Sequence, residues 1–345
     1  MTSSRSQAGL AIAVLSAATF GTSGTFASSL IDAGWSPAAA VTARIAVAAL
    51  LLTVPALIQL RGRWRALRAA AGRVTAYGLI GVAGCQFCYF NALQRMPVGV
   101  ALLLEYLGAV LVVGWLWLRH GQRPRRRTVA GTVGAVTGLA LVLNLGGPGH
   151  ISALGIMWGL LAAASLAIYF VLSAASADAP AAGGGAGPLP PIAMAWGGMC
   201  VGGAALGLLG LAGAVPMAAS TRDVDLLSHQ VSWVVPVLGV ALLATVVGYV
   251  TGISAARRLG AKLASFVGMA EVLFAIGYAW LLLHQLPTAM QFVGGAFIFT
   301  GVALVRIDEL HDEEPAGTVP AGPRPGRDEA DPAVRDQRPD ATVSA

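Results

Sequence analysis

Three ionisable side chains lie inside long apolar stretches of the sequence, and they are the first candidates for a functional role. Arg44, Glu105 and Glu271 are each surrounded by Ala, Val, Leu and Gly. A charge in hydrocarbon is costly, so such residues in membrane proteins commonly bind a substrate or ion or carry protons. The two glutamates therefore predict a proton-exchanging pair or a pair that binds a substrate amine. Hydrogen bonds from Ser, Thr or Tyr of neighbouring helices are the structural alternative.

Arg44 is open to three interpretations. Its guanidinium could bind a substrate carboxylate, form an internal ion pair with Glu105 or Glu271, or extend to the end of its helix and anchor it there. Other polar and aromatic residues of the apolar stretches are softer candidates for lining a wet cavity. These are Gln86, Tyr89, Asn91, Tyr106, Tyr169 and Tyr249.

The composition predicts that membrane helices position these residues. The chain has 345 residues, of which 56% are hydrophobic and 11% charged, whereas soluble domains average about 25% charged residues. Apolar runs long enough to cross a hydrocarbon core of about 30 Å recur from end to end. We expect an all-α integral membrane protein with ten transmembrane helices. The expected spans are 8–31, 37–60, 74–94, 98–118, 128–145, 152–174, 191–213, 233–256, 260–283 and 288–306.

An internal repeat organises these spans. Residues 95–142 align with 258–305 without a gap, so that Gln122-x-Pro124 meets Gln285-x-Pro287. A repeated membrane unit is typical of transporters built from two halves. In this alignment Glu105 lies three residues from the position equivalent to Glu271, so we expect the two carboxyl groups to approach a central cavity from opposite halves.

The charge distribution predicts the orientation of the halves. The formal net charge of +6 does not indicate a nucleic-acid binder, because the basic residues gather in short loops at 61–73, 119–127 and 257–262. The positive-inside rule places these loops in the cytoplasm, and five spans per half require the two repeats to be inverted. The predicted divisions are a cytoplasmic N-terminus at 1–7, five-helix repeats at 8–145 and 152–306, and a disordered cytoplasmic tail at 307–345.

Several other chemistries are not indicated. The sequence has no P-loop, no GxGxxG at a strand–helix junction and no zinc-type His/Cys cluster, so we expect neither an enzyme nor a bound cofactor or metal. Cys85 and Cys88 have a redox-like spacing, but in an apolar run we interpret them as packing residues. Small residues near the end of each repeat predict close helix packing, within the scaffold or between subunits. These are Gly131, Gly134, Gly138, Gly294, Gly295 and Gly301.

Three stretches together resemble the EamA family of the drug/metabolite transporter superfamily. They are Ala43-Arg44-Ile-Ala-Val, Ala270-Glu271-Val-Leu-Phe and Gln291-Phe-Val-Gly-Gly. The resemblance implies export of amino acids, small metabolites or toxic compounds from bacteria, through a cavity lined by the first four spans of each half. It implies Arg44, Glu105 and Glu271 as cavity residues. The family commonly has Gly-Glu before its turns, whereas this chain has Gly121-Gln122 and His284-Gln285, so a role for charge there is not expected.

These observations predict a secondary active transporter of the bacterial cytoplasmic membrane, with both termini in the cytoplasm. It would export a small organic metabolite, amino acid or drug by alternating access, with proton coupling through the glutamates as the working hypothesis. An uncoupled facilitator or channel is the alternative, and a membrane-embedded enzyme is a more distant one. The expected partners are a small-molecule substrate, the lipid bilayer and protons as coupling ion; a homodimer is a further hypothesis, and no nucleic acid is expected.

Overall fold

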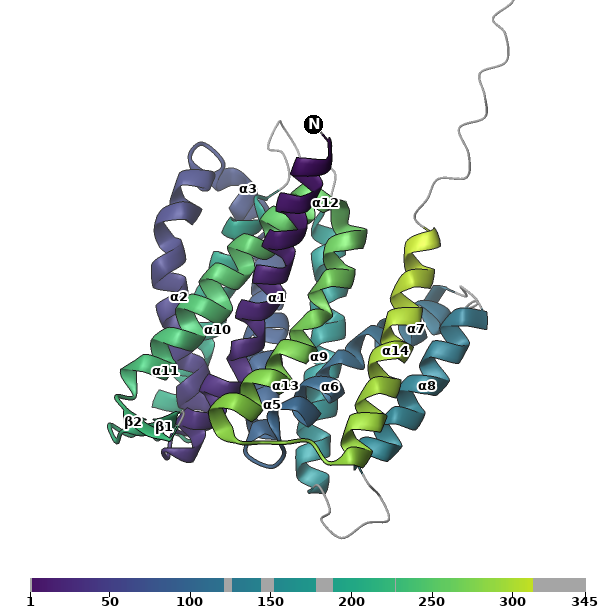
Figure 1. Ribbon diagram of the computed structural model, residues 1–345. Coiled ribbons are helices and arrows are strands. Elements are labelled where there is room, and N and C mark those ends of the chain that lie inside the picture. Colours follow the sequence, from purple (N-terminus) through teal and green to yellow (C-terminus); the bar gives the residue numbers. More distant parts are fainter. Residues whose placement is uncertain (1, 121–125, 144–151, 178–188, 227, 313–345) are drawn as a thin grey trace, which may run out of the picture.

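The computed structural model describes residues 2–120, 126–143, 152–177, 189–226 and 228–312. The described chain forms a bundle of helices that run between two ends of the molecule (Figure 1). Those of the first half are α1 (Thr2–Asp32), α2 (Pro37–Leu60), α3 (Trp64–Ala69), α4 (Ala71–Ala76), the π-helix η1 (Tyr77–Gly84), α5 (Cys85–Leu93), α6 (Val98–Tyr106), α7 (Gly108–His120) and α8 (Arg126–Leu143). Those of the second half are α9 (Ala153–Ala177), α10 (Pro191–Leu211), α11 (Val234–Leu238), the π-helix η2 (Gly239–Val247), α12 (Gly248–Gly268), α13 (Ala270–Leu283) and α14 (Ala289–Asp312).

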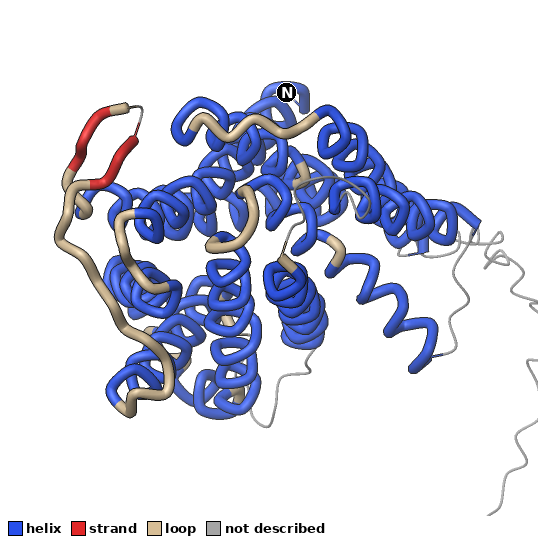
Figure 2. Tube along the Cα trace, turned by 90° about the horizontal axis from the view of Figure 1, so that it is seen from below, coloured by secondary structure: helices blue, strands red, loops and turns tan. Residues whose placement is uncertain are grey.

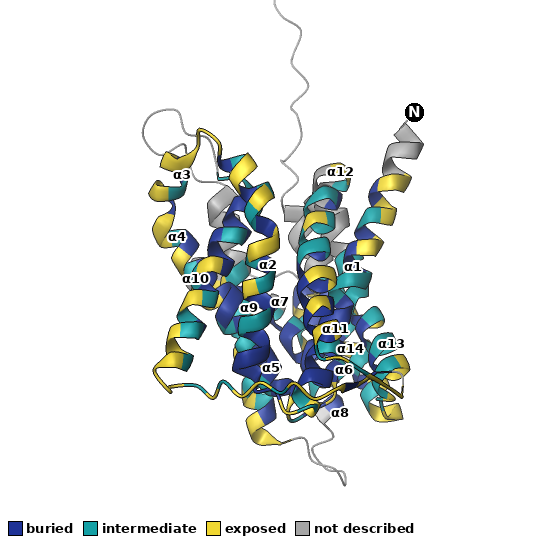
Figure 3. Cartoon of the chain, turned by 90° about the vertical axis from the view of Figure 1, so that its left-hand side faces the viewer, coloured by how far each residue is buried: buried dark blue, intermediate teal, exposed yellow. Residues whose placement is uncertain are grey.

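Length and polarity fit a membrane. Four helical segments of the described chain are long and apolar enough to cross a bilayer: Gln7–Asp32, Pro37–Leu60, Pro191–Leu211 and Val234–Ala255. Exposed residues lie along the outside of the bundle (Figure 3). Among them are large apolar residues such as Leu50, which is 73% exposed. Such a surface suits contact with hydrocarbon. The chain is therefore a multi-pass membrane protein, as predicted.

Local features differ from the prediction. The predicted span 98–118 is interrupted at Leu107, between α6 and α7, and a second interruption falls at Met269, between α12 and α13. The connection predicted near 257–259 lies inside α12, which is helical throughout. The last helix, α14, continues beyond the predicted boundary at 306 to Asp312, and the rest of the predicted tail lies outside the described residues.

The expectation of an all-α chain is wrong in one detail. The strands β1 (Val224–Leu226) and β2 (His229–Val231) form an antiparallel hairpin in the predicted outer loop. The hairpin lies at one edge of the bundle (Figure 2). Val224 and Leu226 are buried while Asp225 between them is exposed, which is the alternation expected of a strand with one face packed on the protein.

The bundle brings distant segments into contact. α1 packs against η2, α12 and α13, whereas α9 packs against η1, α5, α6 and α7. A Cβ atom on Gly9 of α1 would lie 2.7 Å from Leu259, and one on Gly155 of α9 would lie 2.9 Å from Arg95. Such distances are too short for a side chain, so glycine permits both close approaches.

The α8–α14 pair shows the same use of glycine. A Cβ atom on Gly138 would lie 2.5 Å from the carbonyl oxygen of Gly294, and one on Gly301 would collide with the carbonyl oxygen of Gly131. The predicted small-residue faces therefore pack against each other within the chain. A homodimer, if it forms, must use other surfaces.

Candidate functional site

A small central cavity of about 60 Å³ lies among α1, α2, α5, α6, α12 and α13. The structure brings six of the nine residues predicted from the sequence to its wall. They are Arg44, Gln86, Tyr89, Glu105, Tyr249 and Glu271.

Arg44 is buried and held by neutral groups. Its side chain is 4% exposed. Nε donates to Thr245 Oγ1 over 2.9 Å, and Nη1 donates to Ser23 Oγ over 2.7 Å and to Gln86 Oε1 over 2.6 Å. The guanidinium therefore points into the bundle, which removes the interpretation as a helix-end anchor. Nη2 donates no hydrogen bond to any described residue, so it is available to a bound anion.

The π-helix η2 explains how Thr245 reaches this position. The Thr245 hydroxyl donates to the Val240 carbonyl oxygen over 2.9 Å, five residues back along the chain. This spacing is that of a π-helix, a form often found at functional sites. The hydroxyl oxygen then accepts from the guanidinium of Arg44. Sequence reasoning missed Thr245 and Ser23.

The two glutamates lie beside the helix interruptions. Glu105 is two residues before the interruption at Leu107, and Glu271 is two residues after the interruption at Met269. The Cys85 thiol donates to Glu105 Oε1 over 3.2 Å. The Tyr106 hydroxyl donates to Glu271 Oε2 over 2.9 Å. One oxygen of each carboxyl group thus accepts a hydrogen bond from a side chain, and both glutamates line the cavity.

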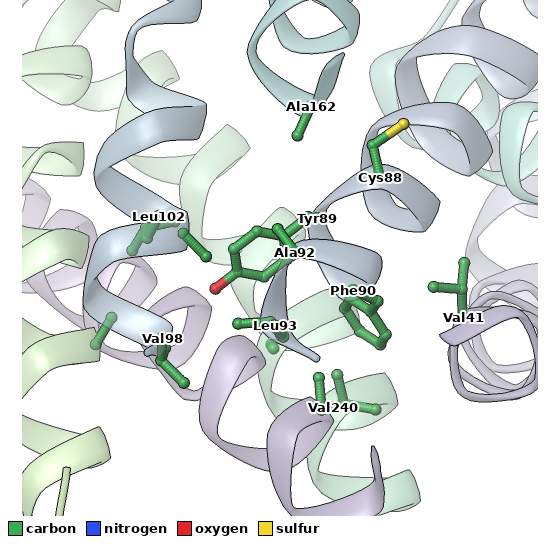
Figure 4. Close-up of a cluster of buried hydrophobic side chains, with 14 of the residues drawn as sticks. Val41, Cys88, Tyr89, Phe90, Ala92, Leu93, Val98, Leu102, Ala162 and Val240 are labelled. Atoms are coloured by element: carbon green, nitrogen blue, oxygen red, sulfur yellow. The ribbon is translucent and has the colours of Figure 1, made fainter. Parts of the chain in front are cut away.

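Cys85 has more than a packing role. Its sulfur contacts the Glu105 carboxyl group and lies 3.6 Å from the Ala162 carbonyl oxygen. The apolar run that contains Cys85 has no acidic residue, so the contact could be found only in the fold. Cys88, by contrast, lies in the buried cluster around Phe90, as expected (Figure 4).

Two glycines of α1 shape the wall of the cavity. A Cβ atom on Gly24 would collide with the Tyr89 hydroxyl oxygen and with Val98. Figure 4 shows this hydroxyl pointing toward α6, away from Phe90. A Cβ atom on Gly21 would lie 3.1 Å from the carbonyl oxygen of Glu271. Glycine at both positions lets α1 approach Tyr89 and α13 closely.

The remaining three candidates lie outside the cavity wall. Asn91 Nδ2 donates to the Phe87 carbonyl oxygen over 2.8 Å. The Tyr169 ring packs on the Tyr77 ring with centroids 5.0 Å apart. Tyr106 reaches the cavity wall through its hydrogen bond to Glu271.

Comparison with known proteins agrees with this architecture. The model of the EamA-like transporter family matches residues 7–144 and 153–307. Among the solved structures that match, one described only as "Crystal structure of protein" has 21% identity and a TM-score of 0.54, and the match covers 89% of this chain and 99% of that chain. No curated protein matches. Because the family model matches twice and covers most of the sequence, the chain belongs to the EamA-like transporter family of the drug/metabolite transporter superfamily.

Proposed function

We propose that this protein is a secondary active transporter that exports a small organic metabolite with both an amine and a carboxylate, such as an amino acid. The observation that carries the proposal is the central cavity, whose wall contains Arg44 together with Glu105 and Glu271. Arg44 Nη2 complements a substrate carboxylate, and the carboxyl groups of Glu105 and Glu271 complement an amine. A guanidinium donor and carboxylate acceptors in one buried site favour a zwitterion over an apolar solute.

We further propose transport by alternating access. A water needs about 10–15 Å³ of such space, so the cavity of about 60 Å³ suits a few waters rather than a whole amino acid. Substrate binding would then require the cavity to open. The interruptions at Leu107 and Met269 supply places where α6 and α13 can change direction, as discontinuous helices do in other transporters.

The inverted arrangement of repeats at 8–145 and 152–306 belongs to the same proposal. Its support is a set of reciprocal contacts. Gly131 packs on Gly301 and Gly138 on Gly294. At the repeat offset Gly131 is equivalent to Gly294 and Gly138 to Gly301, so the two contacts are exchanged by the repeat, as expected for antiparallel helices on either side of a two-fold axis. η1 and η2 lie at nearly the same offset as the repeated residues 95–142 and 258–305. A half-turn about an axis in the membrane plane would produce both relations.

The proposed location is the bacterial cytoplasmic membrane, with the N-terminus and the C-terminal tail inside. The arginine-bearing helix α3 lies at the same end of the bundle as the N-terminus (Figure 1). The opposite end carries the hairpin with the exposed residue Asp225. The excess of arginine at the N-terminal end supports this orientation, since Arg61, Arg63, Arg65, Arg68 and Arg73 gather there.

Proton antiport through Glu105, Glu271 or both is the proposed coupling. The test uses purified protein in proteoliposomes loaded with a pH-sensitive dye, to which a mixture of radiolabelled amino acids is added. Wild type should couple amino-acid uptake to proton flux, and at least one of Glu105→Gln and Glu271→Gln should abolish the flux because an amide cannot release a proton. Asp225→Asn, which lies outside the cavity, is the matched control.

The same assay distinguishes the alternative. An uncoupled facilitator would give amino-acid counterflow without proton flux in wild type. Unchanged pH dependence in both glutamine variants would rule out coupling through the glutamates. No uptake and no thermal stabilisation by any amino acid would overturn the proposed substrate class.

A further inference from the structure

A second cavity, of about 200 Å³, lies between α6, α13 and α14. Its floor is buried, since Leu103, Val272 and Ala279 are 4%, 3% and 2% exposed. Its rim is open, because Leu273 and Phe292 are 61% and 68% exposed. It is therefore a groove in the side of the bundle, which faces hydrocarbon in a membrane.

The groove has a polar end and an apolar body. Gln285 and Gln291 line the end at the connection between α13 and α14, and this connection lies at the end of the bundle opposite the N-terminus (Figure 1). Their side-chain oxygens already accept hydrogen bonds from the Val98 and Thr288 amides, over 3.2 Å and 3.0 Å. The rest of the wall is almost entirely apolar as far as Thr300.

The length of the groove matches one leaflet. From Gln291 to Thr300 the wall follows α14 for ten residues, and the nine steps between them span about 14 Å at 1.5 Å per step. A bilayer core is about 30 Å thick, so each leaflet contributes about 15 Å. The groove thus runs from the membrane surface to about the midplane.

We propose that this groove binds one acyl chain of a phospholipid from the leaflet opposite the N-terminus. Small residues leave the space, since a Cβ atom on Gly295 would lie 3.1 Å from Leu103. An acyl chain fills such an apolar space with dispersion contacts, and Thr300 at the inner end is the one polar side chain of the wall besides Gln285 and Gln291. The polar end at Gln291 is where the headgroup leaves the groove.

The bound chain lies against the same two helices that carry the glutamates. On α13, Glu271 and Ala275 face the central cavity, whereas Val272 and Ile276 face the groove. On α6, Glu105 faces the cavity and Leu103 the groove. The acyl chain therefore supports the α6–α13 contact from outside.

The test is photocrosslinking in nanodiscs with a phosphatidylethanolamine that carries a diazirine in one acyl chain. Peptide mapping of the wild type should find adducts within residues 272–279 and 291–300. Gly295→Phe should reduce these adducts about ten-fold, the change expected for a loss of about 1.4 kcal/mol in binding. Val293→Phe is the matched control, since Val293 lies on the same helix, is 47% exposed and does not line the groove.

Ala296→Leu is a milder second variant at an exposed position of the groove, and size-exclusion chromatography verifies that each variant is folded. Ala296→Leu should also reduce labelling by the lipid probe. Equal labelling of wild type and both groove variants would overturn the proposal. So would labelling of these segments by a small headgroup-free diazirine probe but not by the lipid probe. Both readouts are independent of transport activity.

Discussion

Tyr106→Phe tests the link between the two interrupted helices. The Tyr106 hydroxyl at the end of α6 donates to Glu271 Oε2 at the start of α13 over 2.9 Å. A hydrogen bond to a charged group contributes about 1.5–3 kcal/mol and a neutral one about 0.5–1.5 kcal/mol. If Glu271 is ionised, loss of the hydroxyl should therefore cost about 1 kcal/mol more in wild type than in a Glu271→Gln background, where only a neutral acceptor remains.

The assay is a double-mutant cycle by denaturant unfolding in mixed micelles. Tyr278→Phe is the control, because Tyr278 lies on α13 with Glu271, and its ring stacks on the Phe274 ring with the centroids 6.2 Å apart. The extra cost should disappear at acidic pH, where the carboxyl group is protonated and the hydrogen bond becomes neutral. If Tyr106→Phe costs no more than Tyr278→Phe at any pH, the hydrogen bond does not stabilise the contact and the reasoning fails.

Three further substitutions test the cavity and the scaffold by the same unfolding assay. Thr245→Val should cost about 1–3 kcal/mol because it leaves a buried guanidinium donor unpaired, and Thr245→Ser should restore most of the loss; equal stability of the two variants would contradict this. Gly24→Ala should cost about 1–3 kcal/mol through overpacking, and Tyr89→Phe in the same chain should relieve part of that cost by removing the colliding oxygen. Gly301→Val should destabilise the α8–α14 pair by a similar amount, whereas Gly134→Ala should be close to neutral because its nearest atoms lie 3.9 Å away.

The charged residues of the cavity were predictable because hydrocarbon allows them few environments. Arg44, Glu105 and Glu271 must turn inward toward partners or water, and all three line one cavity. The hydroxyl residues were not predictable in the same way. Thr251 donates to the carbonyl oxygen of Val247, four residues back in its own helix, as threonine in a membrane helix usually does.

Thr245 looks the same in sequence but differs in its backbone. Its hydroxyl bonds to a carbonyl oxygen five residues back rather than four, and only the π-helical geometry turns it toward the guanidinium. A tertiary contact also lies beside the interruption between α6 and α7. A Cβ atom on Gly108, next to the first interruption, would lie 2.6 Å from the Ala163 carbonyl oxygen of α9. Periodicity within one segment contains no information about such a contact.

The repeat allows the two halves to be compared residue by residue, and the differences between them are informative. At the offset that relates 95–142 to 258–305, Glu105 corresponds to Gly268 and Glu271 to Gly108. Each half therefore contributes one carboxyl group and one glycine at the interruption, but in opposite order. The donors also differ, since a thiol, a weak donor, holds Glu105 and a phenol holds Glu271. The two sites are similar in position and unequal in chemistry, so Glu105→Gln and Glu271→Gln should not have equal effects on proton flux. Equal effects would indicate that the geometry of the repeat, rather than the individual hydrogen-bond donors, determines how much each carboxyl group contributes to proton flux.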